Sequence, residues 1–165
     1  MRRLATALTL LIAIAVALVP AALAEPAKNV KPKRTYEGAT TQGAICGTNS
    51  DEICNIALST SKSGRKQDVV IDFSAPCDSG RTLRSTVAVE SLPIPRSGTY
   101  KYRFALSVSL TGAAPGNASG EMLLDGEFKK GRTVGFSKRT ELAIDFDDGT
   151  STDCSAPRFG FNAKP

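Results

Sequence analysis

The most regular feature of this chain is an alternation of apolar and polar residues that recurs from Arg34 to the C-terminus. It is clearest in GTYKYRFALSVSL at 98–110, where six apolar side chains share one parity and Lys101, Arg103, Ser107 and Ser109 take the other. A period of two is the pattern of a β-strand with one buried and one wet face. We therefore expect these residues in the core: Tyr100, Tyr102, Phe104, Leu106, Val108 and Leu110.

The same alternation predicts further strands. Their expected inward residues are Val69, Ile71 and Phe73; Leu83, Val87 and Val89; Met122, Leu124 and Phe128; Val134 and Phe136; Leu142, Ile144 and Phe146; and Phe159 and Phe161. Two weaker strand candidates cover 36–41 and 54–60, the latter with Ile56 and Leu58 on one side. Pro93 and Pro95 cannot donate to a strand ladder, so they are expected to end a strand or mark a sheet edge.

Turn sequences separate the strands: SKSG at 61–64, CDSG at 77–80, PRSG at 95–98, KKG at 129–131 and DDG at 147–149. Short strands with turn chemistry between them, and no helical periodicity, are typical of antiparallel β proteins. We predict an all-β fold over residues 35–165: a single antiparallel β-sandwich or barrel of about eight strands, stapled by disulfides.

The first 24 residues, MRRLATALTLLIAIAVALVPAALA, have the order of a secretory signal peptide: a basic start, an apolar run and small residues. We expect cleavage after Ala24, and Pro20 argues against a retained membrane anchor. Residues 25–34, EPAKNVKPKR, follow as a basic, proline-containing linker, either a solvated tail or a segment that touches an anionic cell surface or wall polymer. The predicted location is secreted, either extracellular or associated with the cell envelope.

An exported chain meets oxidising conditions, where four cysteines indicate two disulfides with three possible connectivities. We prefer Cys46 with Cys54, which closes a short loop, and Cys77 with Cys154, which joins distant parts of the chain. A zinc site is the competing interpretation. It is disfavoured because the chain has no C-x-x-C pair and no histidine.

Composition limits the chemistry further. The absence of histidine excludes a Ser-His-Asp triad and a Cys-His pair, and no phosphate-binding loop or nucleophile elbow occurs. The net charge of +5 is too mild to argue for nucleic acid. Glu121, Asp125 and Glu127 share one outward face, which is typical of a solvated sheet although a carboxylate pair is the alternative. We expect the protein to have no enzymatic activity and to bind no cofactor.

The most acidic stretch, DFDDGTSTDC at 145–154, has two interpretations. The register of an EF-hand fails, but a looser calcium site from Asp147, Asp148 and Asp153 is the weaker alternative. The favoured interpretation is a strand, an Asp-Gly turn and a return strand that delivers Cys154 to Cys77.

Several segments together resemble a known group of proteins: TYEGATTQG, the C-x-x-G turn at 77–80, LPIPRSGTYKYRF, GEFKKGRTVGF and the late cysteine. They are similar to a group of small exported β-sandwich proteins frequent in actinobacteria. The resemblance covers most of the chain after the signal peptide. It implies the fold and export, and it implies no catalytic residue. GAICGTNSDEIC is an addition to that group's pattern.

Taken together, these features predict an exported, non-catalytic module that binds an unknown protein or cell-envelope ligand through its loops. The candidate loops are 42–54, with Thr48, Asn49, Ser50 and Asp51, and 111–120, with Asn117 in an N-x-S sequon. A protease inhibitor that presents the 46–54 loop is one alternative. A hydrolase that uses carboxylates is the other.

Overall fold

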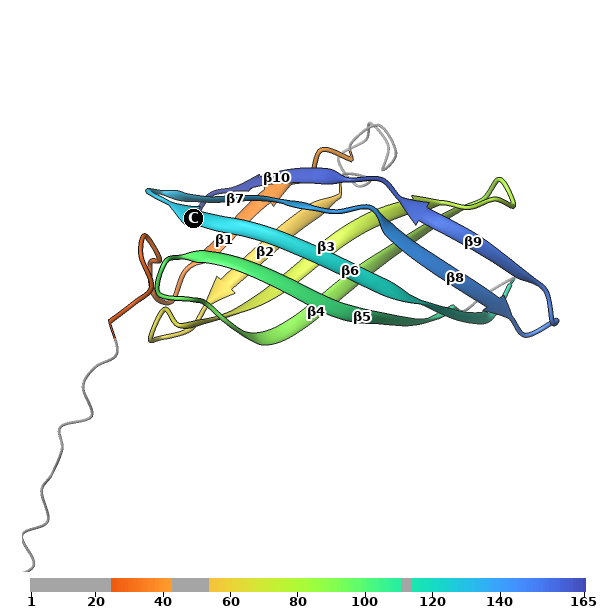
Figure 1. The fold of residues 1–165 in the computed structure, drawn as a ribbon, viewed down its shortest axis with the longest axis horizontal. Helices are drawn as coiled ribbons and strands as arrows, with labels where there is room; N and C mark the ends of the chain where they lie inside the picture. The colour runs from red at the N-terminus through yellow and green to blue at the C-terminus, as the bar shows by residue number, and fades with distance from the viewer. Residues whose placement is uncertain (1–24, 43–53, 111–113) are drawn as a thin grey trace, which may run out of the picture.

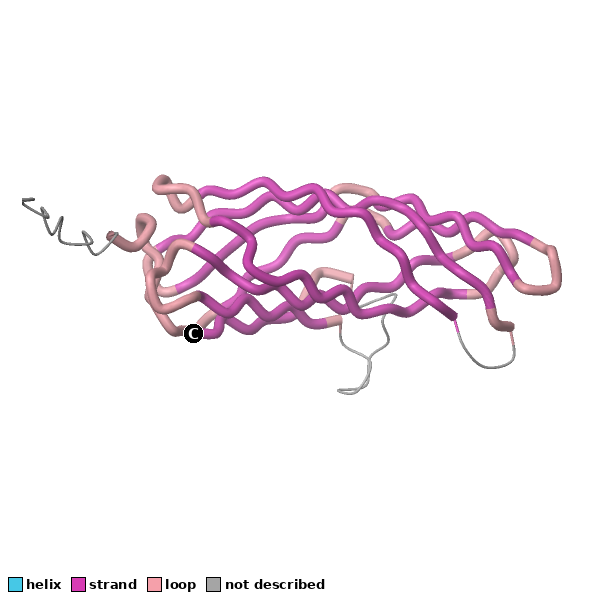
Figure 2. Tube along the Cα trace, turned by 90° about the horizontal axis from the view of Figure 1, so that it is seen from below, coloured by secondary structure: helices cyan, strands magenta, loops and turns pink. Residues whose placement is uncertain are grey.

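The fold of this chain consists of strands and turns (Figure 1; Figure 2). It is known from a computed structural model that describes residues 25–42, 54–110 and 114–165. The strands in these residues are β1 (Thr35–Ala39), β2 (Asn55–Thr60), β3 (Lys66–Pro76), β4 (Thr82–Pro93), β5 (Thr99–Leu110), β6 (Gly116–Lys129), β7 (Arg132–Ser137), β8 (Thr140–Phe146), β9 (Ser151–Ala156) and β10 (Phe159–Ala163). The predicted all-β class is confirmed, and the described residues contain ten strands in place of the expected eight or so.

The strands form two antiparallel sheets that pack face to face. The first has the order β1-β2-β3-β4. In the second, the 14-residue β6 is central: β5 follows one edge, while β7 and β8 pair with the two halves of the other edge. Strands β10 and β9 lie beyond β7 and β8. This arrangement is a sandwich, because the sheets do not close into a barrel.

The two sheets are joined along one side of the sandwich. Glu37 in β1 and Lys164 after β10 exchange two backbone hydrogen bonds, of 2.8 and 2.9 Å. Further along this side, the end of β3 reaches β9 through the Cys77–Cys154 disulfide, with Cα atoms 3.8 Å apart. On the opposite side β4 and β5 are the free edges of their sheets, connected by the 94–98 turn. Pro93 ends β4 at such an edge, as predicted.

The alternation of the sequence carries over into burial along most strands. Ile71, Phe73, Met122, Leu124 and Phe128 are each at most 1 % exposed. The exception is β7, where the prediction was wrong: Thr133 and Ser137 are fully buried, while Val134 and Phe136 lie half-buried on the outer face. There the Phe136 ring packs under the Arg158 guanidinium, 4.3 Å from the ring centroid.

The reversal in β7 follows from two facing glycines at the centre of the second sheet. Tyr100, Gly126, Gly135 and Phe161 are directly opposite one another across β5, β6, β7 and β10. A Cβ atom at Gly126 would overlap the Tyr100 ring, and one at Gly135 would overlap the Phe161 ring. The inner face of β7 must therefore stay small, because aromatic rings from the neighbouring strands lie across it.

The tyrosines of β5 complete their hydrogen bonds within the core. Tyr100 and Tyr102 stack with ring centroids 5.0 Å apart, and Tyr100 Oη lies 3.1 Å from Thr133 Oγ1. Tyr102 Oη accepts from Gln67 Nε2 at 2.7 Å and donates to the Pro93 carbonyl at 3.0 Å. Burial raises the pKa of Tyr102 to about 12, against the lowering effect of the Gln67 hydrogen bond. Both rings are core elements, as predicted.

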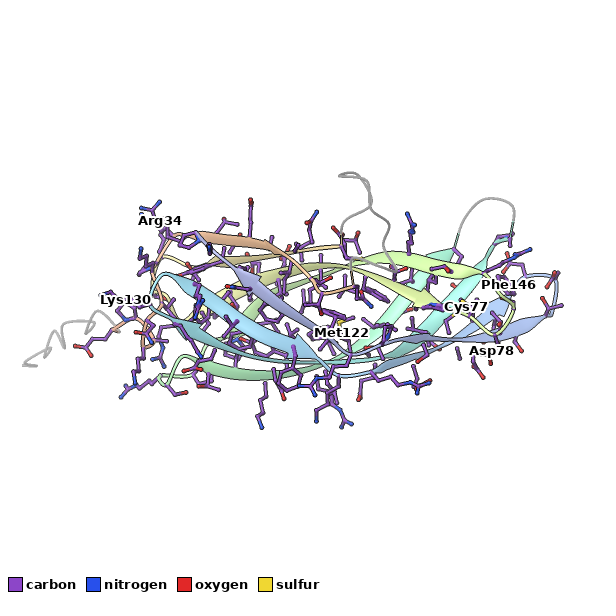
Figure 3. All side chains as sticks on the ribbon, turned by 90° about the horizontal axis from the view of Figure 1, so that it is seen from above. Arg34, Cys77, Asp78, Met122, Lys130 and Phe146 are labelled. Atoms are coloured by element: carbon purple, nitrogen blue, oxygen red, sulfur yellow. A yellow bond between two sulfur atoms is a disulfide. The ribbon has the colours of Figure 1, made fainter. Side chains whose placement is uncertain are left out.

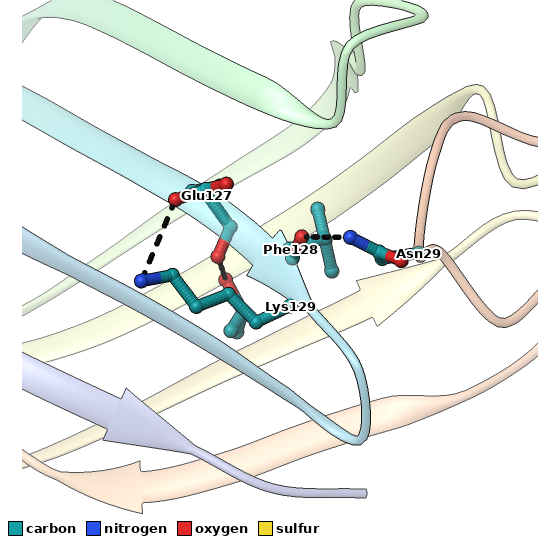
Figure 4. Close-up of polar contacts among 5 residues, drawn as sticks. Asn29, Glu127, Phe128 and Lys129 are labelled. Atoms are coloured by element: carbon teal, nitrogen blue, oxygen red, sulfur yellow. Dashed lines mark hydrogen bonds and ion pairs between the residues drawn. The ribbon is translucent and has the colours of Figure 1, made fainter.

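The segment before β1 differs from the free linker that the sequence predicts. Ala27 and Val30 are 3 % and 7 % exposed and belong to the core. Ala27 N donates to the Gly64 carbonyl at 3.3 Å, Lys28 N to the Arg96 carbonyl at 2.9 Å, and Asn29 Nδ2 to the Phe128 carbonyl at 3.0 Å (Figure 4). Two apolar residues, Ala27 and Val30, stand among the prolines and lysines of this segment and pack into the core. Residues 26–34 therefore form part of the folded unit and cover one end of the sandwich.

The Gly126 contact generates a test. Alanine in place of glycine inside a strand normally stabilises slightly, because it lowers the entropy of the unfolded chain. Gly126→Ala should instead destabilise by about 2 kcal/mol, since the new Cβ displaces the Tyr100 ring. Urea unfolding monitored by circular dichroism measures this change.

The matched control is Gly160→Ala on β10. A Cβ there meets nothing closer than 3.6 Å, so stability should change by less than about 0.5 kcal/mol. Equal unfolding midpoints for the two variants would show that the ring does not depend on the glycine.

Candidate functional site

One hollow among the described residues lies at the disulfide end of the sandwich. A cleft of about 540 Å³ opens between the 77–81 turn, the entry to β6 at Ala114 and Pro115, and the β8–β9 hairpin. Figure 3 places Cys77, Asp78 and Phe146 at this end, opposite Arg34 and Lys130. The volume lies in the range of small-ligand pockets.

The Cys77–Cys154 bridge sets the walls of this cleft. Beside it, Asp78 N donates to the Asp153 carbonyl at 2.9 Å and Ser79 N to Thr152 Oγ1 at 3.3 Å. Gly80, with a φ of 77°, then reverses the chain into β4. The disulfide predicted between Cys77 and Cys154 is confirmed. Cys54 is also disulfide-bonded, while its predicted partner Cys46 lies outside the described residues.

Hydroxyls and two side chains of opposite charge, Arg81 and Asp148, line the cleft. The lining side chains are Ser79, Arg81, Phe146, Asp148, Thr150, Ser151 and Thr152, with Ala114 and Pro115. Asp148 Oδ1 accepts from Thr150 Oγ1 at 2.6 Å and from Thr150 N at 2.9 Å. These hydrogen bonds, with a smaller contribution from the Arg81 charge, lower the pKa of Asp148 below its ordinary value. The carboxylate therefore stays ionised.

A smaller apolar recess of about 120 Å³ adjoins the cleft and shares Ser79, Arg81, Phe146 and Thr152 with it. Its further walls are Cys77, Thr82, Leu83, Leu110 and Ile144. A ligand at this end would meet a guanidinium and several hydroxyls at the mouth and apolar side chains beneath. Few polar groups around an apolar floor are the usual composition of a binding pocket.

The same residues are poorly suited to acid–base chemistry. A general base works best with a pKa near the operating pH, whereas the pKa of Asp148 is lowered, away from that range. The chain contains no histidine to replace it. The arrangement favours recognition of a hydroxyl-bearing group, since Arg81 donates in a planar fork, the Asp148 carboxylate accepts, and the hydroxyls donate and accept.

The structure places the predicted site residues in different parts of the molecule. Among the described residues, no three acids, cysteines or histidines lie together as metal ligands, so Asp147, Asp148 and Asp153 are not assembled as a cation site. Residues 145–154 instead have the favoured strand–turn–strand arrangement: the end of β8, a turn with Gly149 at a φ of 84°, and β9, which carries Cys154. Thr48, Asn49, Ser50 and Asp51 lie outside the described residues.

The predicted 111–120 loop is shorter than expected. Asn117 belongs to β6, paired with Ser109 and Asp145, and its Oδ1 accepts from Ser109 Oγ at 3.3 Å. Ala118 on this strand is buried, which is why residues 116–120 are not available as a flexible loop. On the outer face of β6, Glu121 pairs with Arg103 at 2.8 Å and Glu127 with Lys129 at 3.7 Å. These exposed ion pairs are typical of a solvated sheet face.

Sequence reasoning missed Ser79, Arg81, Thr150 and Thr152 as a group. CDSG and DDGTST were identified as turns, but only the pairing of Cys77 with Cys154 brings the two turns together. The predicted disulfide was therefore the one signal that pointed to this site.

The disulfide gives a stability test. The Cys77–Cys154 bond spans 77 residues, for which chain entropy predicts about 4.5 kcal/mol of stabilisation. Cys77→Ser with Cys154→Ser should lower the free energy of unfolding by about 4 kcal/mol in denaturant titrations.

Cys46→Ser with Cys54→Ser is the control, because the short loop that those residues are predicted to close should be worth only about 2.5 kcal/mol. A larger loss in the control pair would contradict the assignment of the main covalent staple to the 77–154 bond.

The Asp148 contact gives a pH test. Since its folded pKa is depressed, the stabilisation from this carboxylate exists above the ordinary carboxyl range and is lost as the pH falls through the folded pKa. Thr150→Val removes the hydroxyl donor and should move the Asp148 titration midpoint upward in carboxyl-detected NMR. Thr152→Val, which leaves the Asp148 partners intact, should not move it. An unchanged midpoint in Thr150→Val would show that Thr150 does not control the charge.

Within the described residues, no helix is long and apolar enough to cross a membrane. Comparison of this chain with protein-family models, with curated proteins and with solved structures found no match. The resemblance to exported actinobacterial β-sandwich proteins therefore stays a prediction, and the function must be argued from the site itself.

Proposed function

We propose that this protein is an exported, non-catalytic β-sandwich module that binds a partner or cell-envelope ligand through the cleft at its disulfide end. The ligand group that fits is a hydroxylated unit, because Arg81, Asp148 and the surrounding hydroxyls can all hydrogen-bond to hydroxyl groups. The single observation that carries the proposal is the cleft of about 540 Å³ that Arg81 lines together with several hydroxyl side chains. A disulfide in the fold is compatible with an extracellular protein.

Preorganisation supports binding at this end. The 77–81 turn and the β8–β9 hairpin are linked by a covalent bond and by the Asp78 N hydrogen bond of 2.9 Å to Asp153. A ligand then orders few additional groups when it binds, which lowers the entropic cost of association. Charge-assisted hydrogen bonds from Arg81 would supply much of the affinity.

One further observation keeps the 46–54 loop as a second candidate, in the form of a presented, inhibitor-like loop. Both of its flanks are anchored: Gln42 Nε2 donates to the Ser74 carbonyl at 3.0 Å, and Ser74 N donates to Gln42 Oε1 at 3.2 Å. Cys54, on the other flank, is 5 % exposed and disulfide-bonded. The residues between lie outside the described structure.

Retention on an insoluble cell-envelope fraction from which the lipids have been extracted tests the proposal. Arg81→Ala should reduce the retained amount roughly 10-fold or more, since a charge-assisted hydrogen bond is worth about 1.5–3 kcal/mol. Arg103→Ala removes another exposed arginine, on the outer face of β5, and should leave retention unchanged. Near-ultraviolet circular dichroism verifies that each variant is folded.

The outcome also separates the two candidates. Retention unchanged in Arg81→Ala contradicts the cleft. Loss of retention in Cys46→Ser with Cys54→Ser, but not in Arg81→Ala, assigns binding to the 46–54 loop instead.

A further inference from the structure

The end of the sandwich opposite the cleft collects basic side chains from five separate segments. We call it the basic end and define it as residues 25–34, 61–66, 93–99, 127–132 and 163–165. It contains twelve lysines and arginines: Lys28, Lys31, Lys33, Arg34, Lys62, Arg65, Lys66, Arg96, Lys129, Lys130, Arg132 and Lys164. Arg65 is half-buried and the other eleven are exposed.

The backbone that carries these side chains is fixed. Lys33 N donates to the Ser61 carbonyl at 3.2 Å, and Lys28 N to the Arg96 carbonyl at 2.9 Å. Thr60 Oγ1 donates to the carbonyls of Lys31 and Arg34, at 2.7 and 3.0 Å. The turns are thus tied to one another, so the fold sets the relative positions of the segments that carry the charges; Figure 3 shows Arg34 and Lys130 together at this end.

Little opposes this charge locally. The five segments contain two acids, Glu25 and Glu127. Glu127 lies 3.7 Å from Lys129, and this is the one ion pair that the described structure gives to the twelve cations (Figure 4). Surface charges held close together without partners create a strong local potential.

The opposite end has the reverse charge. Its 77–81 turn and the tip of its β8–β9 hairpin, 145–153, carry a single cation, Arg81, against five acids: Asp78, Asp145, Asp147, Asp148 and Asp153. The modest net charge of +5 therefore conceals a separation of charge along the long axis. Near an anionic surface, such a molecule is oriented with the basic end inward and the cleft outward.

Two observations favour a membrane surface as the partner. The apolar run at 4–19, predicted to be a signal peptide, precedes Glu25 of the basic end, so before cleavage a membrane-inserted run would hold this end beside the bilayer. Among the described residues Val70, on the outer face of β3, is the one large hydrophobic side chain that is exposed. The contact is accordingly electrostatic, with no apolar group to insert between acyl chains.

We propose that the basic end docks reversibly on the phosphate headgroups of an anionic phospholipid surface and holds the cleft away from it. This proposal concerns a different surface from the cleft and does not depend on the proposed function. Clusters of lysine and arginine bind acidic lipids through charge alone, and several such residues suffice for peripheral attachment. The attachment falls with salt, because the interaction decays over about 8 Å at physiological ionic strength.

The test is flotation of residues 25–165 with vesicles of phosphatidylcholine alone or mixed with phosphatidylglycerol. This part of the chain contains the whole described core, whose first residue is Ala27, and lacks the apolar run. The protein should bind the anionic vesicles and not the zwitterionic ones. The variant Lys62→Glu, Arg96→Glu, Lys130→Glu, with one change in each of three turns, should lower the partition coefficient roughly 100-fold or more.

The matched control is Lys138→Glu, Arg139→Glu, Arg158→Glu, which changes the net charge equally. These residues flank Ser137, which pairs with Leu124, about 17 Å along β6 from Lys129 and thus beyond the screening length. The control should retain most of the binding.

Three results would overturn the proposal: equal binding to both vesicle types, equal losses in the two triple variants, or no binding to anionic vesicles. If soluble polyphosphate binds through the same three residues while vesicles do not, the partner is a soluble polyanion and the membrane is excluded. Because none of these variants touches Arg81, failure here leaves the outcome at the cleft unaffected.

Discussion

The contact on which much of this structure depends is the Tyr100 ring lying over Gly126. Only glycine leaves room for the ring on the inner face of β6, and the ring then packs against Phe128, with centroids 5.7 Å apart. Phe128 in turn meets Tyr36 of the other sheet edge-on at 5.3 Å. One missing side chain therefore fixes an aromatic cluster that joins the two sheets, and such pairs add to the free energy gained from area burial alone.

This cluster also positions the segment before β1. Asn29 binds the Phe128 carbonyl at 3.0 Å, and Lys31 N donates to Tyr36 Oη at 3.1 Å. Gly98, whose φ is 76°, lies against the Lys28 carbonyl so closely that a side chain would not fit. The basic residues of the segment are thus held by the polar atoms and backbone of the aromatic cluster. A sequence that looks like a tail becomes a structured charged surface because its two apolar residues, Ala27 and Val30, find a core to cover.

The sequence could predict what depends on local periodicity. The inward residues of β3, β5, β6 and β8 and the turns between strands follow from alternation and turn chemistry, and the Cys77–Cys154 bond belongs to the preferred one of three possible connectivities. Where contacts between distant segments decide burial, alternation alone gave the wrong prediction. Val134 and Phe136 were assigned to the core because they are apolar, yet Gly135 between them carries the Phe161 ring, and a glycine in mid-strand was the available signal. The docking of residues 26–34 and the meeting of Arg81 with Thr150 needed the fold itself. Hydrophobic periodicity carries no information about the ligands of the cleft or of the basic end.

The two ends of the sandwich are closed by different physical means, and this difference accounts for the cleft. At the basic end, Tyr36, Tyr100 and Phe128 are each at most 1 % exposed, so packing closes it. Toward the disulfide, the inward residues Leu83, Leu110 and Phe146 are only partly buried and line the small recess. Packing there is incomplete, and the covalent bond between Cys77 and Cys154 holds the sheets together in its place. A hollow at the mouth of a sandwich normally weakens the fold, because its lining loses contacts. The disulfide removes that conflict, since it stabilises this end largely through the unfolded chain. The end that is least well packed can therefore also be the end that stays open and rigid enough to bind.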